Sequence, residues 1–199
     1  MIFILIFLFL RMGEVYLFRH GTTSDNANGV FSGWRDVPLN EKGFKDAKII
    51  ALRLKDKKID MAFRSSLLRS GQTLKEVLRF HPKCKSIIID DRIRERNYGK
   101  LQGQIHLNIV KKYGYKKYDE WHRSYDKKAI RGESLKDVEK RVQSFIKNLM
   151  TLIKGRNINV AISAHGNSMR PFRRHFEKLS ILEMMNLYND YETVYVYKV

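Results

Sequence analysis

The sequence has too little cysteine to be stabilised by disulfides or by a cysteine-bound metal. Among its 199 residues Cys84 is the only cysteine, so neither an intrachain disulfide nor a cluster of thiolate ligands can form. Such sparse cysteine is typical of the reducing cytoplasm, and we expect a cytoplasmic protein. The histidines also lack the spacing of metal ligands, and no metal is expected.

Apolar runs long enough to cross a membrane are lacking too. The run from Ile2 to Leu10 is far shorter than the roughly 20 residues of a spanning helix. It has neither the basic flank nor the A-x-A cleavage site of a signal peptide. Met12 offers a second start. We interpret residues 1–12 as an apolar extension from a mis-set start, with a weak membrane-surface anchor as the alternative. Residues 13–199 then form a single catalytic domain, because no repeat or low-complexity linker divides them.

Acidic residues are scarce as well: 21 Asp and Glu face 39 Lys and Arg, for a formal net charge of +18. Such a field attracts phosphorylated metabolites, nucleic acid or acidic membranes, and charge alone does not choose among them. The lysines are spread along the chain without a basic tail, so a lysine-rich background explains the charge at least as well as a nucleic-acid surface does. Hydrophobic residues make up 43%, enough for a sizeable core.

Strand-like and helix-like segments alternate along the chain. Short apolar runs predict strands, and they lie at residues 15–18, 60–63, 86–90, 159–164 and 193–199. Between them, Asn40 caps a helix with Phe44, Ala47, Ile50, Ala51 and Leu54 on one face, and residues 67–80 read as another. Ser134 with Asp137 caps a third helix, and a last one begins near Asn167 with Pro171 in its first turn. This alternation predicts an α/β fold, a three-layer α/β/α sandwich around a mainly parallel sheet.

Basic side chains follow two of these strands. Arg19 and His20 come directly after the first strand and precede Gly21, and His165 with Gly166 follows strand 159–164. In open parallel sheets ligands bind beyond the carboxyl ends of the strands, so these groups should meet at one edge. Guanidinium groups suit phosphoryl oxygens, and imidazole can act as a nucleophile near neutral pH. The pattern therefore indicates phosphoryl chemistry.

Five motifs extend this pattern into a family resemblance. The segments LFRHGTTSDN (17–26) and SAHGNS (163–168) are similar to the histidine phosphatase superfamily. FSGWRDVPLNEKG (31–43), SSLLRSGQT (65–73) and RERNYGKLQG (94–103) resemble its 2,3-bisphosphoglycerate-dependent phosphoglycerate mutase branch. A lone R-H-G is a weak signal, but five motifs in family order are a strong one. The resemblance implies a phosphoglycerate mutase-like fold.

The resemblance also implies roles for individual residues. His20 would be the phosphohistidine nucleophile, and Arg19, Arg69, Asn26 and His165 would form the phosphate pocket. Glu95 would be the general acid and base, and it would need a raised pKa to donate a proton near pH 7, which partial burial could provide. The remaining substrate-binding set consists of Ser32, Gly33, Tyr98, Arg123, Gly166 and Asn167. The primer would be 2,3-bisphosphoglycerate, no metal would be needed, and the partner would be a small phosphorylated metabolite.

Departures from the branch leave the activity open. His122-Arg123 stands where mutases carry two arginines, and His106 replaces a lysine. The proline-rich insertion that normally follows R-R-S-F-D is absent, since SYDKKAIRGESL (124–135) leads almost directly into the next helix, and the long C-terminal tail is missing too. The leading hypothesis is interconversion of 3-phosphoglycerate and 2-phosphoglycerate in glycolysis and gluconeogenesis. A more open site would instead favour a phosphomonoester phosphatase. A third hypothesis is a non-catalytic anion- or nucleic-acid-binding protein. The candidate site residues argue against it, because binding alone would not require an acid/base carboxylate, and nucleic acid is not expected as a partner.

Each assignment has a plainer alternative. Glu95 could be a solvated ion pair, Arg69 could neutralise a helix face, and Ser32 with Gly33 could simply form a turn. We expect His106 and His122 to be surface residues, and Trp121, His175 and Tyr188 to be packing or amphipathic surface residues. Homo-oligomerisation stays open.

Overall fold

The protein is built around a central sheet. The computed structural model describes residues 13–199, and the expectation for residues 1–12 lies outside them. Within the described part, five strands lie in the order β3-β2-β4-β1-β5, and only β5 runs antiparallel to its neighbour. They are β1 (Glu14–Arg19), β2 (Met61–Arg64), β3 (Ser86–Ile89), β4 (Val160–Ala164) and β5 (Val194–Lys198). The five predicted strands are thereby confirmed.

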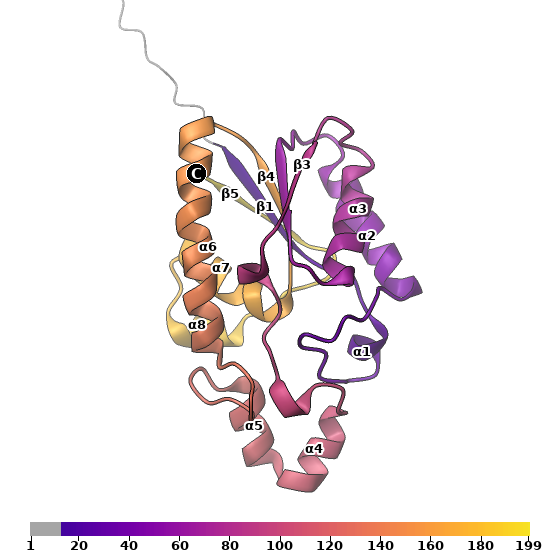
Figure 1. The fold of residues 1–199 in the computed structure, drawn as a ribbon, viewed down its shortest axis with the longest axis vertical. Coiled ribbons are helices and arrows are strands. Elements are labelled where there is room, and N and C mark those ends of the chain that lie inside the picture. Colours follow the sequence, from indigo (N-terminus) through magenta and orange to yellow (C-terminus); the bar gives the residue numbers. More distant parts are fainter. Residues whose placement is uncertain (1–12) are drawn as a thin grey trace, which may run out of the picture.

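Helices cover both faces of this sheet (Figure 1). On one face α2 (Glu41–Leu54) and α3 (Leu68–Leu78) pack against Tyr16 and Phe18 of β1. On the other, α6 (Leu135–Arg156) and α7 (Gly166–Glu177) pack against Val15 and Leu17. The predicted three-layer α/β/α sandwich is confirmed. The remaining helices are α1 (Ser24–Ala27), α4 (His106–Tyr113), α5 (Tyr115–Arg123) and α8 (Ile181–Asn186), with 3-10 turns at Asp91–Ile93 and Gly99–Leu101.

Local signals in the sequence explain where several helices begin. The side chain of Asn40 accepts a hydrogen bond from the Gly43 amide at 2.8 Å. Ser134 and Asp137 form a reciprocal capping box at the start of α6, which satisfies amides that have no partner within the helix. Both predicted caps are confirmed. No helix of residues 13–199 is at once long and apolar enough to cross a membrane.

Two details of the predicted helices are wrong. The helix near Asn167 begins at Gly166, so Pro171 is its sixth residue and lies inside it rather than in its first turn. There the missing proline N–H removes a bond to the Asn167 carbonyl. The helix is not the last one either, because α8 follows, started by a Ser180 capping box. Its six residues are too few to show a clear apolar period.

The pairing of β1 with β4 positions the two motif histidines. The strands run parallel with Arg19 opposite Ala164, and the His20 amide donates to the Ala164 carbonyl at 3.0 Å. His20 and His165 therefore leave the sheet side by side, as expected for residues that follow neighbouring parallel strands.

A close contact between two glycines fixes the loop that follows His20. A Cβ on Gly43, in the first turn of α2, would lie 2.0 Å from the Thr22 carbonyl oxygen, and one on Gly21 would lie 2.2 Å from the Gly43 carbonyl oxygen. Only glycine at both positions lets α2 approach the backbone beside His20 so closely.

We expect Gly43→Ala to destabilise the protein even though alanine favours helices. Overpacking of this kind costs about 1–3 kcal/mol, and the methyl group can be accommodated only by moving the Thr22 backbone. The free energy of unfolding in urea measures the change. Gly155→Ala in α6 is the matched control, because its Cβ meets nothing within 4 Å and should gain about 0.5–1 kcal/mol. Equal stabilisation by both substitutions would refute the contact.

Candidate active site

A cavity of about 580 Å³ opens beyond the carboxyl ends of β1 and β4. Its walls come from segments far apart in the sequence: the loop after β1, the residues around Glu95, the helices α5 and α7, and the chain between α8 and β5. Arg19, His20, Arg69 and Glu95 border it directly.

His20 is held as a neutral imidazole with one nitrogen facing a cation. The ring is 1% exposed, and its Nδ1 lies 2.7 Å from the Gly21 carbonyl oxygen, which only a protonated Nδ1 can bond. Nε2 then carries the lone pair, and Arg69 Nε donates to it at 3.2 Å. Burial lowers the pKa of His20 well below 6.5, with the charges of Arg69 and Arg19 acting in the same direction. The unprotonated nitrogen is what a nucleophile requires.

The two arginines are anchored by backbone carbonyls. Arg69 is 1% exposed and donates to the carbonyls of Arg35 and Gly33, each at 2.8 Å. Arg19 donates to the Asn189 carbonyl at 2.9 Å and lies 3.9 Å above the ring of Tyr191. Its buried Nε has no partner among the described residues. Anchored guanidiniums with donors to spare are suited to an oxyanion.

His165 offers a second donor beside His20. The ring centroids are 4.9 Å apart, and His165 Nε2 lies 2.7 Å from Ser65 Oγ. Because the Leu67 amide already donates to that oxygen, the Ser65 hydroxyl can donate to Nε2. In the tautomer that accepts this hydroxyl, the His165 proton lies on Nδ1, a buried atom for which residues 13–199 provide no partner. Burial lowers the pKa of His165 well below 6.5, with Arg69 and His20 adding to the effect.

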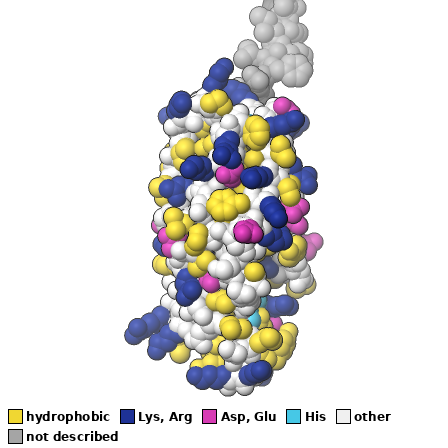
Figure 2. All heavy atoms as spheres, turned by 90° about the vertical axis from the view of Figure 1, so that its right-hand side faces the viewer, with side chains coloured by type: hydrophobic (Ala, Val, Ile, Leu, Met, Phe, Trp, Pro, Cys, Tyr) yellow, Lys and Arg dark blue, Asp and Glu magenta, His cyan; other side chains and the backbone are white. Residues whose placement is uncertain are grey.

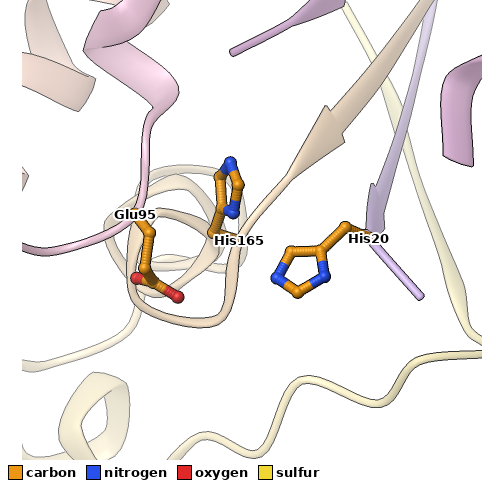
Figure 3. A group of neighbouring side chains, drawn as sticks. All are labelled: His20, Glu95 and His165. Carbon is orange, nitrogen blue, oxygen red and sulfur yellow. The ribbon is translucent and has the colours of Figure 1, made fainter. Parts of the chain in front are cut away.

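Glu95 lies near the two histidines, on the other side of His165 from His20 in the view of Figure 3. It is 7% exposed, and its Oε1 accepts hydrogen bonds from the amides of Arg96 and Asn167 at 2.7 and 3.1 Å. The indole of Trp34 donates to its backbone carbonyl at 2.6 Å, which ties the FSGW motif to this residue. Ligand atoms of Glu95, His20 and His165 lie within 4.8 Å of one another. The two guanidiniums beside them favour an anion over a metal cation.

Arg96 fastens this part of the site to α5. It is 1% exposed and donates to the carbonyls of Trp121, His122, Lys127 and Glu133. The loop that carries Glu95 is thus joined to the helix that carries Arg123.

The residues predicted to bind substrate all border the cavity. They are Asn26, Ser32, Gly33, Tyr98, Arg123, Gly166 and Asn167. The Tyr98 hydroxyl accepts a hydrogen bond from the Asn167 side chain at 3.2 Å. Ser32 Oγ is buried and unpartnered within the described chain. Asn26 has a structural task as well, because its Oδ1 accepts from the amide and hydroxyl of Thr23.

The expectation that His106 and His122 lie on the surface is wrong. Both are half-buried and border the cavity. His106 stacks on Phe31 with centroids 3.8 Å apart, and His122 meets the same ring edge-on at 5.4 Å. The reason is that α4 and α5 fold back over Phe31. Tyr188 is exposed, as expected, but it too borders the cavity.

Sequence reasoning missed Arg170, Asn189 and Tyr191, which also border the cavity. Arg170 could have been found, since it lies three residues after Asn167 and so on the same face of α7. Asn189 and Tyr191 belong to an irregular segment between α8 and β5 and carry no motif. This segment is what covers the site near Arg19.

Comparison with known proteins agrees with this geometry. The sequence profile of the histidine phosphatase superfamily (branch 1) matches residues 15–199. The chain is 38% identical over 170 residues to "Phosphoglycerate mutase" of Schizosaccharomyces pombe, covering 82% of this chain and 79% of that protein. It is 33% identical over 204 residues to the 2,3-bisphosphoglycerate-dependent phosphoglycerate mutase of Methanococcus vannielii, covering 88% and 86%.

Solved structures share the fold across most of the chain. The alpha-ribazole phosphatase from Shigella flexneri has a TM-score of 0.79 at 21% identity, covering 92% of this chain and 89% of that one. Phosphoglycerate mutase from Bacillus anthracis has a TM-score of 0.70 at 22% identity, covering 84% and 81%.

The fold and the paired histidines thus define an enzyme class that includes both mutases and phosphatases, and the chain belongs to the histidine phosphatase superfamily (branch 1). Within it, the chain resembles the 2,3-bisphosphoglycerate-dependent phosphoglycerate mutases.

We expect Tyr191→Leu to weaken oxyanion binding, because the ring no longer stacks on Arg19. A cation–π contact of about 0.5–1 kcal/mol corresponds to a roughly two- to five-fold higher Kd for inorganic phosphate, measured by calorimetry. Tyr191→Phe keeps the ring and should bind normally. Tyr188→Leu is the matched control, since Tyr188 borders the cavity but is 72% exposed. An unchanged Kd in Tyr191→Leu would show that the stacking is incidental.

Stability should fall as the pH is lowered through 6.5. The folded-state pKa values of His20 and His165 lie below the unfolded value of about 6.5. Near that pH, these two residues therefore take up protons only in the unfolded chain. Each such histidine contributes a slope of about 1.4 kcal/mol per pH unit. His20→Asn should therefore flatten the slope, measured by urea unfolding between pH about 7.5 and about 5.5. His175→Asn, at a partly buried ring, should flatten it less. If the free energy of unfolding of His20→Asn depended on pH as steeply as that of the parent, His20 would be charged in the folded protein.

Proposed function

We propose that the protein is a phosphoglycerate mutase that interconverts 3-phosphoglycerate and 2-phosphoglycerate through phosphohistidine at His20. The role would be in glycolysis and gluconeogenesis. The names of the relatives support this proposal. The observation on which it rests is the arrangement of arginine side chains around the cavity.

Four guanidinium groups from different elements of the fold border the cavity. Arg19 and Arg69 flank His20, whereas Arg123 and Arg170 border the cavity from α5 and α7. Glu95 acts electrostatically on both Arg69 and Arg170. A mutase must hold its substrate by a second anionic group while the phosphoryl group changes oxygen atoms, which simple hydrolysis does not require. The guanidinium groups of Arg123 and Arg170 suit a carboxylate in that role.

In the proposed phosphoryl transfer, each of these residues has a separate role. The lone pair of His20 Nε2 forms the bond to phosphorus as the phosphorus–oxygen ester bond breaks. Arg19, Arg69 and the Nδ1–H of His165 stabilise the equatorial oxygens in the transition state. The Glu95 carboxyl protonates the departing oxygen, and its carboxylate accepts the proton of the hydroxyl that next attacks phosphohistidine. No water is needed in either step.

The primer 2,3-bisphosphoglycerate fits this donor set. Two buried donors, Arg19 Nε and His165 Nδ1, find no acceptor within residues 13–199, as is expected where an anion supplies the missing oxygens. Arg19, Arg69 and His165 would hold one phosphate, and Arg123 with Arg170 would hold the carboxylate side. When bound, the primer would supply the phosphoryl group that loads His20.

A phosphomonoester phosphatase is the second candidate. The observation that favours it is the cover of the site, which near Arg19 consists of the short segment with Asn189 and Tyr191. Water that reached phosphohistidine through such a cover would release phosphate.

Incubation with labelled 2,3-bisphosphoglycerate tests the proposal. Label should enter an acid-labile phosphoenzyme and, after 3-phosphoglycerate is added, appear in phosphoglycerates rather than in free phosphate. His20→Ala should abolish both signals, because it removes the nitrogen that attacks phosphorus in the proposed mechanism. Glu95→Gln should still become labelled but turn over about 10²–10⁴-fold more slowly.

Glu120→Gln, at a surface ion pair with Lys117, is the control and should behave like the parent enzyme. Dominant release of free phosphate would decide for the phosphatase. Normal rates in His20→Ala would rule out the phosphohistidine mechanism altogether.

A further inference from the structure

The turn between α4 and α5 forms an exposed tip at the end of the molecule opposite the start of β1 (Figure 1). Its sequence is KKYGYKK, residues 111–117, and every one of these residues is exposed. Gly114 at the centre has φ +79° and open space around it, which permits the sharp reversal. Four lysines and two tyrosines are therefore displayed on a convex turn.

Positive charge is concentrated around this tip. Residues 105–131 contain eight Lys and Arg and three Asp and Glu, a difference of +5 in 27 residues and about twice the average density of the chain. Lys117 pairs with Glu120, and Lys128 with Asp137. Lys111, Lys112 and Lys116 form no ion pair with the residues that the structure describes.

Exposed apolar side chains lie among these charges. Leu107 is 68% exposed, Tyr115 63% and Ile130 61%. Leu107 lies four residues before Lys111, so the two share a face of α4. Figure 2 shows Lys and Arg side chains beside a group of hydrophobic ones at this end of the molecule. Aliphatic groups flanked by lysines are the arrangement by which helices lie in a bilayer interface.

We propose that the α4–α5 tip docks on the surface of an anionic lipid bilayer, with Lys112 and Lys116 on the headgroups and Leu107 in the interface. The proposal goes beyond the phosphoryl-transfer activity and does not depend on it. Charge complementarity selects an acidic partner. A second copy of the chain would oppose lysines to lysines, and single-stranded nucleic acid binds positively charged grooves rather than a convex tip with aliphatic side chains.

Docking would bear on the active site because the same two helices form its wall. His106 of α4 and His122 with Arg123 of α5 border the cavity. The protein would therefore bind lipid with the hairpin that also lines its substrate site.

Flotation of the full chain with vesicles tests the proposal. One vesicle contains phosphatidylcholine alone and the other equal parts of phosphatidylcholine and phosphatidylserine. We expect binding only to the second, weakened by salt. Lys112→Gln/Lys116→Gln should bind roughly thirty-fold more weakly, since each lysine near an anionic surface contributes about a five-fold factor. Leu107→Ser should also bind more weakly. None of the substituted residues borders the cavity. Unchanged turnover and an unchanged circular dichroism spectrum therefore confirm that each variant is folded.

Matched controls are Lys45→Gln/Lys48→Gln and Leu52→Ser on α2, where the lysines are exposed and Leu52 is 57% exposed. They should bind as the parent does. The apolar run of residues 2–10 is present in every variant, so its contribution cancels when variants are compared on the same vesicles. Equal losses in variants and controls, equal binding to both vesicles, or an unchanged Lys112→Gln/Lys116→Gln would each overturn the proposal. So would tighter, Lys112- and Lys116-dependent binding of a single-stranded oligonucleotide.

Discussion

The parallel pairing of β1 with β4 is the constraint on which the rest of the site depends. Its register sets Arg19 opposite Ala164, so that the next residue of each strand is a histidine. Neighbouring strands are about 4.8 Å apart, and the two ring centroids are separated by nearly the same distance, 4.9 Å. A shift of one residue would turn one of the rings toward the opposite face of the sheet. The contact of Gly21 with Gly43 then holds the following loop against α2, which keeps the Gly21 carbonyl in place to fix the tautomer of His20.

The site concentrates positive charge on side chains that are almost completely buried. Arg69 and the two histidines are each no more than 1% exposed, and Glu95 is the carboxylate that approaches them. Burying cations beside one another is unfavourable unless they are compensated, and here the imidazoles stay neutral while carbonyl groups anchor the guanidiniums. An anion that enters supplies the missing compensation. Stability and ligand binding are therefore coupled, because any oxyanion that binds only the folded state shifts the unfolding equilibrium.

Much of this could be predicted from local sequence, and the remainder depends on long-range packing. The strands, the caps at Asn40 and Ser134 and the convergence at one sheet edge follow from periodicity, capping chemistry and topology. The family motifs add Glu95, which local patterning alone would leave as an ion pair. Nothing local identifies Tyr191, because its position over Arg19 arises from the fold of an irregular segment. Likewise, His106 and His122 look like surface residues until α4 and α5 close over Phe31. Pro171 lies beyond the first turn of α7 because the helix begins at Gly166, where the backbone amide of the N-cap His165 donates to the Ser168 side chain.

Arg96 has a mechanical consequence. Its guanidinium is clamped to four carbonyl oxygens that span residues 121–133, while its own amide is bound by the Glu95 carboxylate. Glu95 and the cavity wall formed by His122 and Arg123 of α5 are thus connected through a single residue. A shift of α5 would therefore be passed to the Glu95 carboxylate, so in the proposed enzyme selectivity for the remote part of a substrate is coupled to reactivity at phosphorus.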